Sequence, residues 1–413
     1  MSKQMRILHV SHQYPPAVGG SEKYIADLST ELASRGHQVD VFTSRSVDYH
    51  TWRNELPNFE KQAGVSVYRY RSLQRRAYVW KMLQFGLERY WIKRAVRYEP
   101  FIFFGGGPLA PGLFWTMLRR GHYYDLVHLN SLVYSHTAYG YWAAKKLGLP
   151  VVVTPHVHAE QPVTYDIGYQ RRVLSGVDHV IADTLAEQTW LTSELGLSSH
   201  RVSHLGVGIK ETDYRLNMSQ AQAREQLGVP KSGFSLLFLG RKTDYKGLDV
   251  TLRAYEVLKS QGCDIHLLAI GPETDYSENL WPQYAHLTDV YRFGKVTDSE
   301  KVMALQACDC LVMPSVGEAF GIVYLEAWMM GKPVIGAQIK AVSSLIQHDH
   351  DGWLIAADDV SDLAEKIKQW VLNPTLAKTM GQRGLEKVQQ RYTTTQIGDR
   401  AEAIYQQVLA KKL

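Results

Sequence analysis

Cysteine is scarce in this chain of 413 residues, and nothing in it resembles a disulfide framework or a secretory signal. The three cysteines, Cys263, Cys308 and Cys310, are too few and too clustered for such a framework. Positions 1–6 run directly into a strand-like segment, so we expect no signal peptide. Both observations favour free thiols and a location in the reducing cytoplasm.

Long hydrophobic runs and a strong net charge are also missing. The longest uncharged stretch, residues 100–118, is interrupted by glycines and prolines, whereas a membrane-spanning helix needs roughly 20 mostly apolar residues. The formal net charge is only +5, which excludes the dense basic face of a dedicated nucleic-acid binder. We therefore expect no nucleic acid as a partner, and any anionic partner to be a small phosphate compound or a membrane surface.

Short β-branched runs alternate with helical patterns through both halves of the chain. This alternation is typical of parallel sheets connected by crossover helices, and a chain of 413 residues is expected to need two cores. The pattern restarts after a polar stretch near residues 210–231, which indicates a boundary near residue 208. The predicted strands span residues 7–10, 39–42, 126–129, 151–153 and 180–182 in the first half, and 234–239, 265–270, 310–313 and 333–335 in the second.

The fold class that follows is α/β, with two doubly wound, Rossmann-like domains. Ligands of such folds bind beyond the carboxyl ends of the strands, so a central cleft that both domains face is the expected site. The side chains that follow each predicted strand are therefore the first candidates for function.

The segment from Arg69 to Arg97 is strongly basic and aromatic. It holds nine Arg or Lys residues and a single acidic residue, Glu88, and apolar residues repeat every four positions between 79 and 87. This pattern predicts a basic amphipathic helix. One interpretation is a surface helix packed normally on the first domain. The other is contact with an anionic membrane surface or a phosphate-bearing acceptor.

Two cations follow the predicted strand 234–239. The stretch from Gly240 to Gly247 places Arg241 and Lys246 between the end of this strand and a helix that starts at about Leu248. Arginine offers a planar fork and lysine a point charge, so the two can converge on a diphosphate. Each charged hydrogen bond is worth roughly 1.5–3 kcal/mol. The alternative is that these cations are only solvated.

Two glutamates follow the predicted strand 310–313. Glu318 lies in a loop, and a helix that begins near Phe320 or Gly321 carries Glu326 among apolar residues. A helix N-terminus presents free N–H groups to an anion, and a glycine lets that anion approach closely. A buried carboxylate is costly without partners, and ribose hydroxyls would suit Glu326. The alternative is a carboxylate that reaches solvent or a structural arginine.

Three separated motifs occur together in a specific order. They are the Glu-x7-Glu spacing of Glu318 and Glu326, the Gly-Arg-x4-Lys-Gly stretch, and the N-terminal stretch from Tyr14 to Glu22. In this combination the chain resembles the retaining glycosyltransferase family 4, which has the GT-B fold. The similarity covers essentially the whole chain, including the framework segments 331–335 and 351–354.

The resemblance implies roles for residues of the second domain. Arg241 and Lys246 match the pair that neutralises the donor diphosphate and the charge developing on the leaving group. Glu318 matches the glutamate that contacts the hydroxyls of the donor sugar, and Glu326 matches the one that holds the ribose. Backbone groups complete this implied site, with N–H groups near Phe320, Gly321 and Ile322 holding phosphate and the turn at Phe293 and Gly294 meeting the nucleobase.

The resemblance also implies two sites in the first domain. Gly19 and Gly20 open a helix after the first strand and leave room for a sugar or phosphate, although a flexible turn is the alternative. His156 matches the active-site histidine close to the reacting sugar, whereas a histidine beyond a strand is otherwise often a hydrogen-bonded loop residue. His158 is a weaker candidate.

The implied activity is a retaining, metal-independent hexosyltransferase without a cofactor. A nucleotide-diphosphate sugar, with UDP-sugar favoured, would be the co-substrate, and the acceptor would be a hydroxyl of a glycan, a lipid-linked compound or a small molecule. Residues 1–208, joined by a C-terminal helix that crosses back within 393–413, would bind the acceptor, and residues 209–392 the nucleotide sugar. The enzyme would be cytoplasmic, with possible peripheral contact at the inner membrane face through the segment from Arg69 to Arg97.

Two other functions are compatible with this architecture. A nucleotide-sugar epimerase would act on its donor without an acceptor, and the Glu-x7-Glu motif argues against it. A non-catalytic sugar-nucleotide-binding protein is the other alternative, and the intact set of Glu318, Arg241, Lys246 and His156 argues against it.

Three further features of the sequence do not indicate a functional site. Asp349 and Asp351 have the spacing of a metal-binding pair but fall in a polar turn, so we expect no metal there. The glycine run 105–107 lacks the context of a dinucleotide fingerprint and predicts a flexible loop. In the linker, Leu205 and Gly208 stand where the family usually has polar residues, so the hydrogen bonds usual there are not expected.

Overall fold

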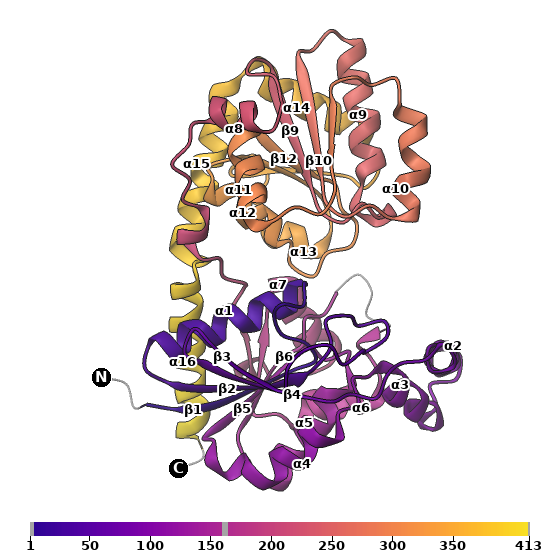
Figure 1. Cartoon of the computed structure of the whole chain (residues 1–413), viewed down its shortest axis with the longest axis vertical. Helices are drawn as coiled ribbons and strands as arrows, with labels where there is room; N and C mark the ends of the chain where they lie inside the picture. Colours follow the sequence, from indigo (N-terminus) through magenta and orange to yellow (C-terminus); the bar gives the residue numbers. More distant parts are fainter. Residues whose placement is uncertain (1–3, 159–163, 412–413) are drawn as a thin grey trace. The chain divides into compact units, whose positions relative to one another are not determined.

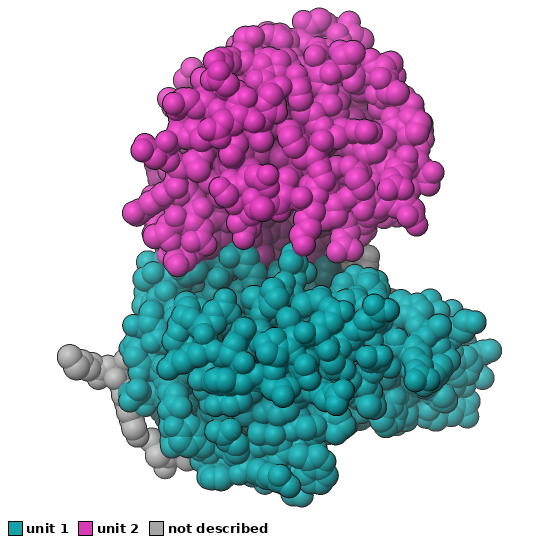
Figure 2. All heavy atoms as spheres, viewed as in Figure 1, with its two compact units in different colours: residues 1–208, 394–413 teal, residues 209–393 magenta. Residues whose placement is uncertain are grey.

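The computed structural model describes residues 4–158 and 164–411, and the chain divides into two compact units. Unit 1 comprises residues 1–208 and 394–413, and unit 2 comprises residues 209–393 (Figure 2). Positions 1–3, part of the stretch behind the expectation of no signal peptide, lie outside the described residues.

Unit 1 is built on an eight-stranded sheet with the order β3-β4-β2-β1-β5-β6-β7-β8 (Figure 1). All neighbouring strands are parallel except β3, which pairs antiparallel with β4 at the edge. The central strands are buried over nearly their whole length, as expected for a sheet covered on both faces. The strands are β1 (Arg6–Ser11), β2 (Gln38–Ser44), β3 (Phe59–Gln62), β4 (Val65–Tyr70), β5 (Leu126–Asn130), β6 (Val151–Thr154), β7 (His179–Ala182) and β8 (Val202–His204).

The helices of unit 1 include one from the far end of the chain. In α16, Tyr405 is fully buried, and its hydroxyl group lies 2.5 Å from His128 Nδ1 on β5 and 3.3 Å from His9 Nε2 on β1. The C-terminal helix therefore crosses back to the first unit and completes its core. The helices are α1 (Gly20–Ser34), α2 (Ala77–Lys93), α3 (Glu99–Gly106), α4 (Pro111–Arg120), α5 (Ser135–Lys146), α6 (Gly168–Gly176), α7 (Leu185–Thr189) and α16 (Thr394–Ala410).

Unit 2 has a six-stranded, all-parallel sheet with the order β11-β10-β9-β12-β13-β14. Its strands are β9 (Phe234–Leu239), β10 (Ile265–Ile270), β11 (Val290–Phe293), β12 (Cys310–Met313), β13 (Val334–Ala337) and β14 (Gly352–Ile355). Its helices are α8 (Gln220–Gln226), α9 (Leu248–Ser260), α10 (Asp275–Leu280), α11 (Asp298–Ala307), α12 (Ile322–Met329), α13 (Lys340–Ser343), α14 (Val360–Leu372) and α15 (Pro374–Arg391). Both units are thus Rossmann-like, and the predicted α/β class is confirmed.

The predicted strands and helices are confirmed, and β9, β10 and β12 agree with the prediction at both ends. The expectation of a flexible loop at residues 105–107 is wrong, because Gly105 and Gly106 form the end of α3. A Cβ atom at Gly105 would lie 2.6 Å from the Cβ of Leu83, and one at Gly86 would lie 2.8 Å from that of Phe101. These glycines therefore allow α2 and α3 to approach closely, side by side (Figure 1).

Across the described residues, no single helix is long and apolar enough to cross a membrane. Two helical segments, Val96–Gly106 and Pro111–Tyr123, are together long and apolar enough for a membrane crossing by length and composition alone, but they are bent against each other by 94°.

Candidate active site

Two loops of unit 2 meet at the carboxyl ends of β9 and β12. Gly247 has a left-handed backbone with φ of 77°, and a Cβ atom there would lie 2.5 Å from the carbonyl oxygen of Pro314. The carbonyl oxygen of Tyr245 accepts hydrogen bonds from the backbone N–H of Val316 (2.9 Å) and from Ser315 Oγ (3.2 Å). A glycine is therefore required at 247 for the loop after β9 to lie directly on the loop after β12.

This contact brings together Lys246 and Glu318. Lys246 Nζ donates a hydrogen bond to Glu318 Oε1 over 2.5 Å, and both side chains are largely buried. Arg241, which starts the same loop, is exposed and forms no ion pair with any part of the chain that the structure describes. Two cations and one carboxylate thus lie at the carboxyl ends of neighbouring strands, where α/β folds bind ligands.

The helix N-terminus predicted near Gly321 is present. Gly321 is the N-cap of α12 with φ of 89°, and no side chain caps the helix. The first N–H groups of a helix have no intrahelical partner, so those at Ile322 and its neighbours can bind an anion. Phe320 is buried before the N-cap, with its ring centroid 5.9 Å from that of Tyr392.

Glu326 is buried in α12, and its carboxylate already has protein partners. Its Oε1 accepts hydrogen bonds from the Tyr214 hydroxyl and from Lys301 Nζ, each over 2.8 Å. Neighbouring Glu326 raises the pKa of Lys301, although burial alone would lower it. Sequence reasoning missed Tyr214 and Lys301, because neither belongs to a motif or follows a strand of the sheet.

Phe293 is the last residue of β11 rather than part of a free turn, and its carbonyl oxygen accepts a hydrogen bond from Lys242 Nζ over 2.9 Å. The same ammonium group pairs with Glu273, which also accepts from Trp281 Nε1 over 3.0 Å. Burial lowers the pKa of Lys242 although Glu273 opposes this shift. Lys242 was not predicted as a site residue. Its fully buried side chain fixes the loop after β9 against the edge of the sheet.

In unit 1, His156 follows β6 with a left-handed backbone, φ 55°. Its Nδ1 pairs with Asp183, which follows β7, and its Nε2 lies 2.7 Å from Asn130 Oδ1 at the end of β5. Three neighbouring strands therefore hold one imidazole ring between two oxygen acceptors. The Tyr24 ring packs against the imidazole in a T-shaped arrangement, with centroids 5.1 Å apart.

A second carboxyl group lies behind this pair. Glu187 is fully buried and accepts backbone hydrogen bonds from Val157 and Asp183, each over 2.7 Å. Burial and the neighbouring Asp183 raise the pKa of Glu187 above its ordinary value of 4.5. Burial works against a charged His156, but Asp183 outweighs it, so the pKa of His156 is raised above 6.5. Both ring nitrogens face oxygen acceptors, and the raised pKa favours the protonated form of the ring.

Gly19 and Gly20, which were predicted to leave room for a sugar or phosphate, lie beside the carboxylate of Glu22. Gly20 opens α1, and a Cβ atom at Gly19 would clash with Glu22 Oε2. Glu22 Oε1 lies 2.9 Å from His12 Nε2. Burial alone would raise the pKa of Glu22, but His12 and the hydrogen bonds outweigh it and lower this pKa to about 2. The space at Gly19 is thus filled by the Glu22 carboxylate.

The structure places the predicted residues in two sets, one in each unit. Unit 2 contributes Arg241, Lys246, Glu318, Glu326 and the backbone at Phe293 and at 320–322, and unit 1 contributes Gly19, Gly20 and His156. Asn130, Asp183, Glu22 and Lys242 were missed. Asp183 and Asn130 could have been found, since each ends or follows a predicted strand.

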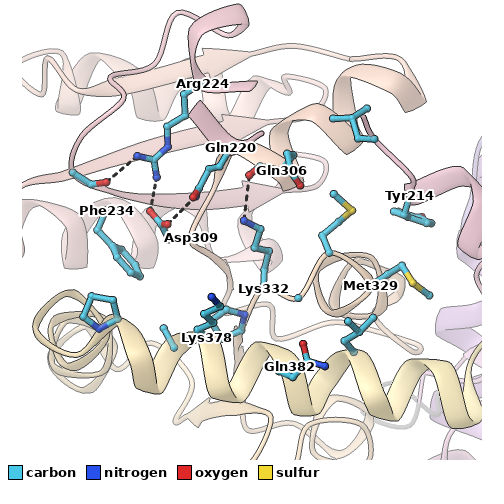
Figure 3. A pocket seen from close by; sticks show the side chains of 18 of the residues that line it. Tyr214, Gln220, Arg224, Phe234, Gln306, Asp309, Met329, Lys332, Lys378 and Gln382 are labelled. Atoms are coloured by element: carbon cyan, nitrogen blue, oxygen red, sulfur yellow. Dashed lines mark hydrogen bonds and ion pairs between the residues drawn. The ribbon is translucent and has the colours of Figure 1, made fainter. Parts of the chain in front are cut away.

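A cavity of about 1220 Å³ in unit 2 lies away from this site, at the amino ends of β9, β12 and β13 (Figure 3). Arg224 pairs with Asp309 over 2.6 Å, and Lys332 Nζ donates to the carbonyl oxygens of Gln306 and Cys308. The charged side chains named here thus already have hydrogen-bond partners within the protein. The cavity lies at the opposite end of the strands from the loops that hold Lys246 and Glu318.

The aspartates of the turn at 349–351 have structural partners. Asp351 is buried, pairs with Lys387 and accepts the backbone N–H of Gln347 over 2.9 Å, and Asp349 accepts Trp353 Nε1 over 2.9 Å. Among the residues that the structure describes, no group of three His, Cys, Asp or Glu side chains could hold a metal ion.

Comparison with known families identifies both units. Residues 19–208 match a family model described as a glycosyl transferase 4-like domain, and residues 219–387 match one described as glycosyl transferases group 1. The chain belongs to glycosyltransferase family 4. The two matches lie in separate units and together span most of the chain.

Relatives and solved structures agree with this assignment. The glycosyltransferase is 26% identical to a D-inositol 3-phosphate glycosyltransferase of Streptomyces scabiei, over 91% of this chain and 84% of the relative. Its fold matches that of Anabaena HepE in complex with UDP-glucose (TM-score 0.73, 20% identity, 97% of this chain and 99% of that one). It also matches sucrose-phosphate synthase of Thermosynechococcus elongatus (TM-score 0.74, 20% identity, 98% and 100%). The GT-B fold is confirmed.

Proposed function

We propose that this glycosyltransferase moves a hexose from a nucleotide-diphosphate sugar, with UDP-sugar favoured, to an acceptor hydroxyl group with retention of configuration. The observation that carries the proposal is the contact of Lys246 with Glu318 beside the uncapped N-terminus of α12. A cation, a sugar-binding carboxylate and free N–H groups then lie where a diphosphate and its sugar can bind together. The UDP-glucose bound to HepE supports the choice of nucleotide.

The proposed donor site uses the unit 2 residues in distinct roles. Arg241 and Lys246 hold the diphosphate together with the N–H groups near Gly321, and Glu318 holds hydroxyls of the transferred sugar. Glu326 holds the ribose, since its Oε1 is already bonded and its Oε2 accepts no hydrogen bond from the described residues. Backbone groups at Phe293 and Gly294 meet the base.

The proposed mechanism is electrostatic and uses no metal. Negative charge develops on the departing diphosphate as the glycosidic bond breaks, and preorganised cations stabilise that charge. The acceptor hydroxyl attacks from the face that the phosphate leaves, and the departing phosphate takes its proton. The anomeric configuration is thereby retained. His156, whose pKa Asp183 raises, would contribute positive charge to the reacting sugar when it is protonated.

We assign the acceptor to unit 1, with a glycan, a lipid-linked compound or a small molecule as its class. Three exposed apolar side chains of α2, Tyr78, Phe85 and Ile92, recur every seven residues and so form one line along the helix. Basic residues flank this line, and an anionic membrane surface suits such a face. We therefore propose cytoplasmic action with peripheral contact at the inner membrane face.

The decisive experiment is a panel of UDP-, GDP- and ADP-sugars tested for thermal stabilisation of the protein, followed by turnover assays with the best donor. A UDP-hexose is expected to give the largest shift, and the anomeric configuration of the product, read by NMR, tests retention. An epimerised sugar formed from donor alone, or no stabilisation by any nucleotide sugar, would refute the proposal.

A further inference from the structure

A cavity of about 180 Å³ lies in unit 1 between the start of α2 and the end of α3. Its wall is largely apolar, with Trp52, Val79, Met82 and Leu109 among the lining side chains. One charged residue, Arg75, also lines it. None of these residues belongs to the donor site described above.

Arg75 is an unusual buried cation. Its side chain lies between the rings of Trp52 and Trp80, at 5.4 Å and 5.0 Å from their centroids, and only 9% of the residue is exposed. Its guanidinium donates to two backbone carbonyl oxygens, those of Tyr49 (3.2 Å) and Gly106, but it forms no ion pair with the described residues. Its Nε–H is buried without an acceptor. Burial lowers the pKa of Arg75, as expected for a cation without a carboxylate partner.

A second buried donor without an acceptor lines the same cavity. Trp52 is only 1% exposed, and its indole N–H has no hydrogen-bond partner. The residue also has a left-handed backbone, φ 55°, which is strained for a bulky side chain. Buried donors without acceptors are uncommon in native proteins, and here one belongs to an unpaired guanidinium and the other to an indole ring on the wall of the same cavity, a combination that favours an anionic ligand.

The helix at this end adds to the positive potential. Helix α2 is 17 residues long and begins at Ala77, and no side chain caps its N-terminus. Tyr78, in its first turn, lines the cavity. The free N–H groups and the dipole of such a helix favour negative charge at this end.

The rim of the cavity is apolar and open to solvent. Leu73, Tyr78 and Phe104 line it and are 61%, 66% and 54% exposed. Inorganic phosphate would gain nothing from these side chains, whereas an attached alkyl or prenyl chain would cover them. The cavity therefore matches an amphiphile with an anionic head.

A chain of ring contacts connects this cavity to the glycine turn of unit 1. The rings of Trp52 and Tyr134 form a T-shaped contact with centroids 5.7 Å apart, and Tyr134 stacks on His12 at 4.0 Å. His12 pairs with Glu22 beside Gly19. The rings of Trp52, Tyr134 and His12 would thus connect a ligand bound at Arg75 with the turn that precedes α1.

We propose that this cavity binds the phosphate or diphosphate head of an amphiphile, and that it anchors a lipid-linked acceptor in unit 1. Arg75, the Trp52 indole N–H and the N-terminus of α2 hold the head, and Leu73, Tyr78 and Phe104 contact its apolar chain. The anchoring of an acceptor rests on the proposed function, whereas the binding of the amphiphile does not.

Calorimetric titration of the full chain, without any nucleotide sugar, tests the site with octyl phosphate and inorganic phosphate as probes. Octyl phosphate is expected to bind more tightly than inorganic phosphate. Arg75→Gln should weaken octyl phosphate binding by about tenfold or more, because a charged hydrogen bond is lost. Lys93→Gln removes an exposed positive charge from the last turn of α2, at the other end of the helix, and it should leave the affinity within about twofold.

Trp52→Phe keeps an aromatic ring and removes only the unpaired N–H, so it decides the matter if Arg75→Gln does not fold. It should also weaken binding, and Lys246→Ala should bind octyl phosphate as the wild type does, which separates failure of this site from failure of the donor site. Phosphatidylcholine vesicles with and without phosphatidic acid distinguish the sources. Arg75-dependent binding to the acidic vesicles identifies a bilayer lipid, and its absence identifies a dispersed amphiphile. Equal affinity for both phosphates, or unchanged binding in Trp52→Phe and in folded Arg75→Gln, would overturn the proposal.

Discussion

Lys246 Nζ lies 2.5 Å from Glu318 Oε1, so the loops that follow two neighbouring strands are joined by one charged hydrogen bond. The carboxylate holds the ammonium group at the carboxyl end of the sheet when no diphosphate is bound. Under the proposed function, a bound diphosphate would compete for the same ammonium group and leave Glu318 available to sugar hydroxyls. The pair would then prepare both groups for a donor.

Removal of either cation should abolish most turnover. Arg241→Ala and Lys246→Ala each lose a charged hydrogen bond to the diphosphate, worth about 1.5–3 kcal/mol, and kcat should fall by roughly ten- to hundredfold. Lys231→Ala, which removes an exposed lysine paired with Glu225, is the control and should keep wild-type kcat. Unchanged rates in both donor-site variants would contradict the assigned diphosphate contact.

Substitution of Glu326 should change the binding of the donor more than the rate of the chemical step. Glu326→Gln keeps the size of the side chain but weakens its hold on ribose hydroxyls, so KM for the donor should rise by about tenfold with a smaller change in kcat. Lys301→Met is the matched control, since it removes the ion-pair partner over 2.8 Å and leaves the carboxylate. An equal fall of kcat in both variants would show that Glu326 acts only as a structural ion pair.

Alanine substitutions at two glycines with a left-handed backbone, Gly262 and Gly247, distinguish the cost of backbone strain from the cost of a steric clash. Gly262, φ 78°, has open space where a Cβ atom would lie, whereas a Cβ atom at Gly247, φ 77°, would lie 2.5 Å from the Pro314 carbonyl oxygen. Gly262→Ala should cost about 1–2 kcal/mol in the free energy of unfolding, the strain alone. Gly247→Ala should cost more and also reduce turnover, as measured by urea denaturation and kinetics. Equal costs would mean that the loop at Pro314 gives way easily.

The stability of the protein should depend on pH through His156. The raised pKa values of His156 and Glu187 make these two groups bind more protons in the folded state than in the unfolded chain, so their contribution to stability should fall as pH rises between about 5 and 8. The buried His9, His128, His136 and His179, whose pKa values burial lowers, contribute in the opposite direction, so the contribution of the two groups is read from the difference between the wild type and a variant. Asp183→Asn removes the charge that raises the pKa of His156 and that adds to the effect of burial on Glu187, so the stability advantage of the wild type over the variant should shrink by an amount on the order of 1 kcal/mol as pH rises across this range. Urea denaturation at a series of pH values measures it, and an unchanged slope would contradict the pairing.

The sheet of unit 2 could be predicted because its central strands are short, continuous runs of mainly apolar residues. Phe234–Leu239 and Ile265–Ile270 are fully buried, and the predicted ends agree with those in the structure. The edge strand Val290–Phe293 has only half-buried and exposed residues, so its pattern carried little signal. The glycines at 105 and 106 were misread because their close contacts, with Leu83 and with Ser135 respectively, arise from tertiary packing and not from the local sequence.

The candidate site could be predicted in part because its motifs follow strands. Lys246 and Glu318 were located by that rule, but the hydrogen bond between them depends on the close contact at Gly247, which no local pattern encodes. The partners of Glu326, Tyr214 and Lys301, come from positions 112 and 25 residues away in the chain. Such contacts arise from tertiary packing and leave no mark on spacing.

The return of α16 to unit 1 has a consequence for the order of folding during synthesis. Unit 2 is one continuous segment, whereas the core of unit 1 lacks Tyr405 and its hydrogen bonds to His9 and His128 until residues 394–413 have been made. The usual order of assembly, in which the N-terminal domain folds first, is therefore reversed in part. During translation, unit 1 cannot complete its core until unit 2 and residues 394–413 have been synthesised. Fragments that end near residue 208 should therefore be incompletely packed.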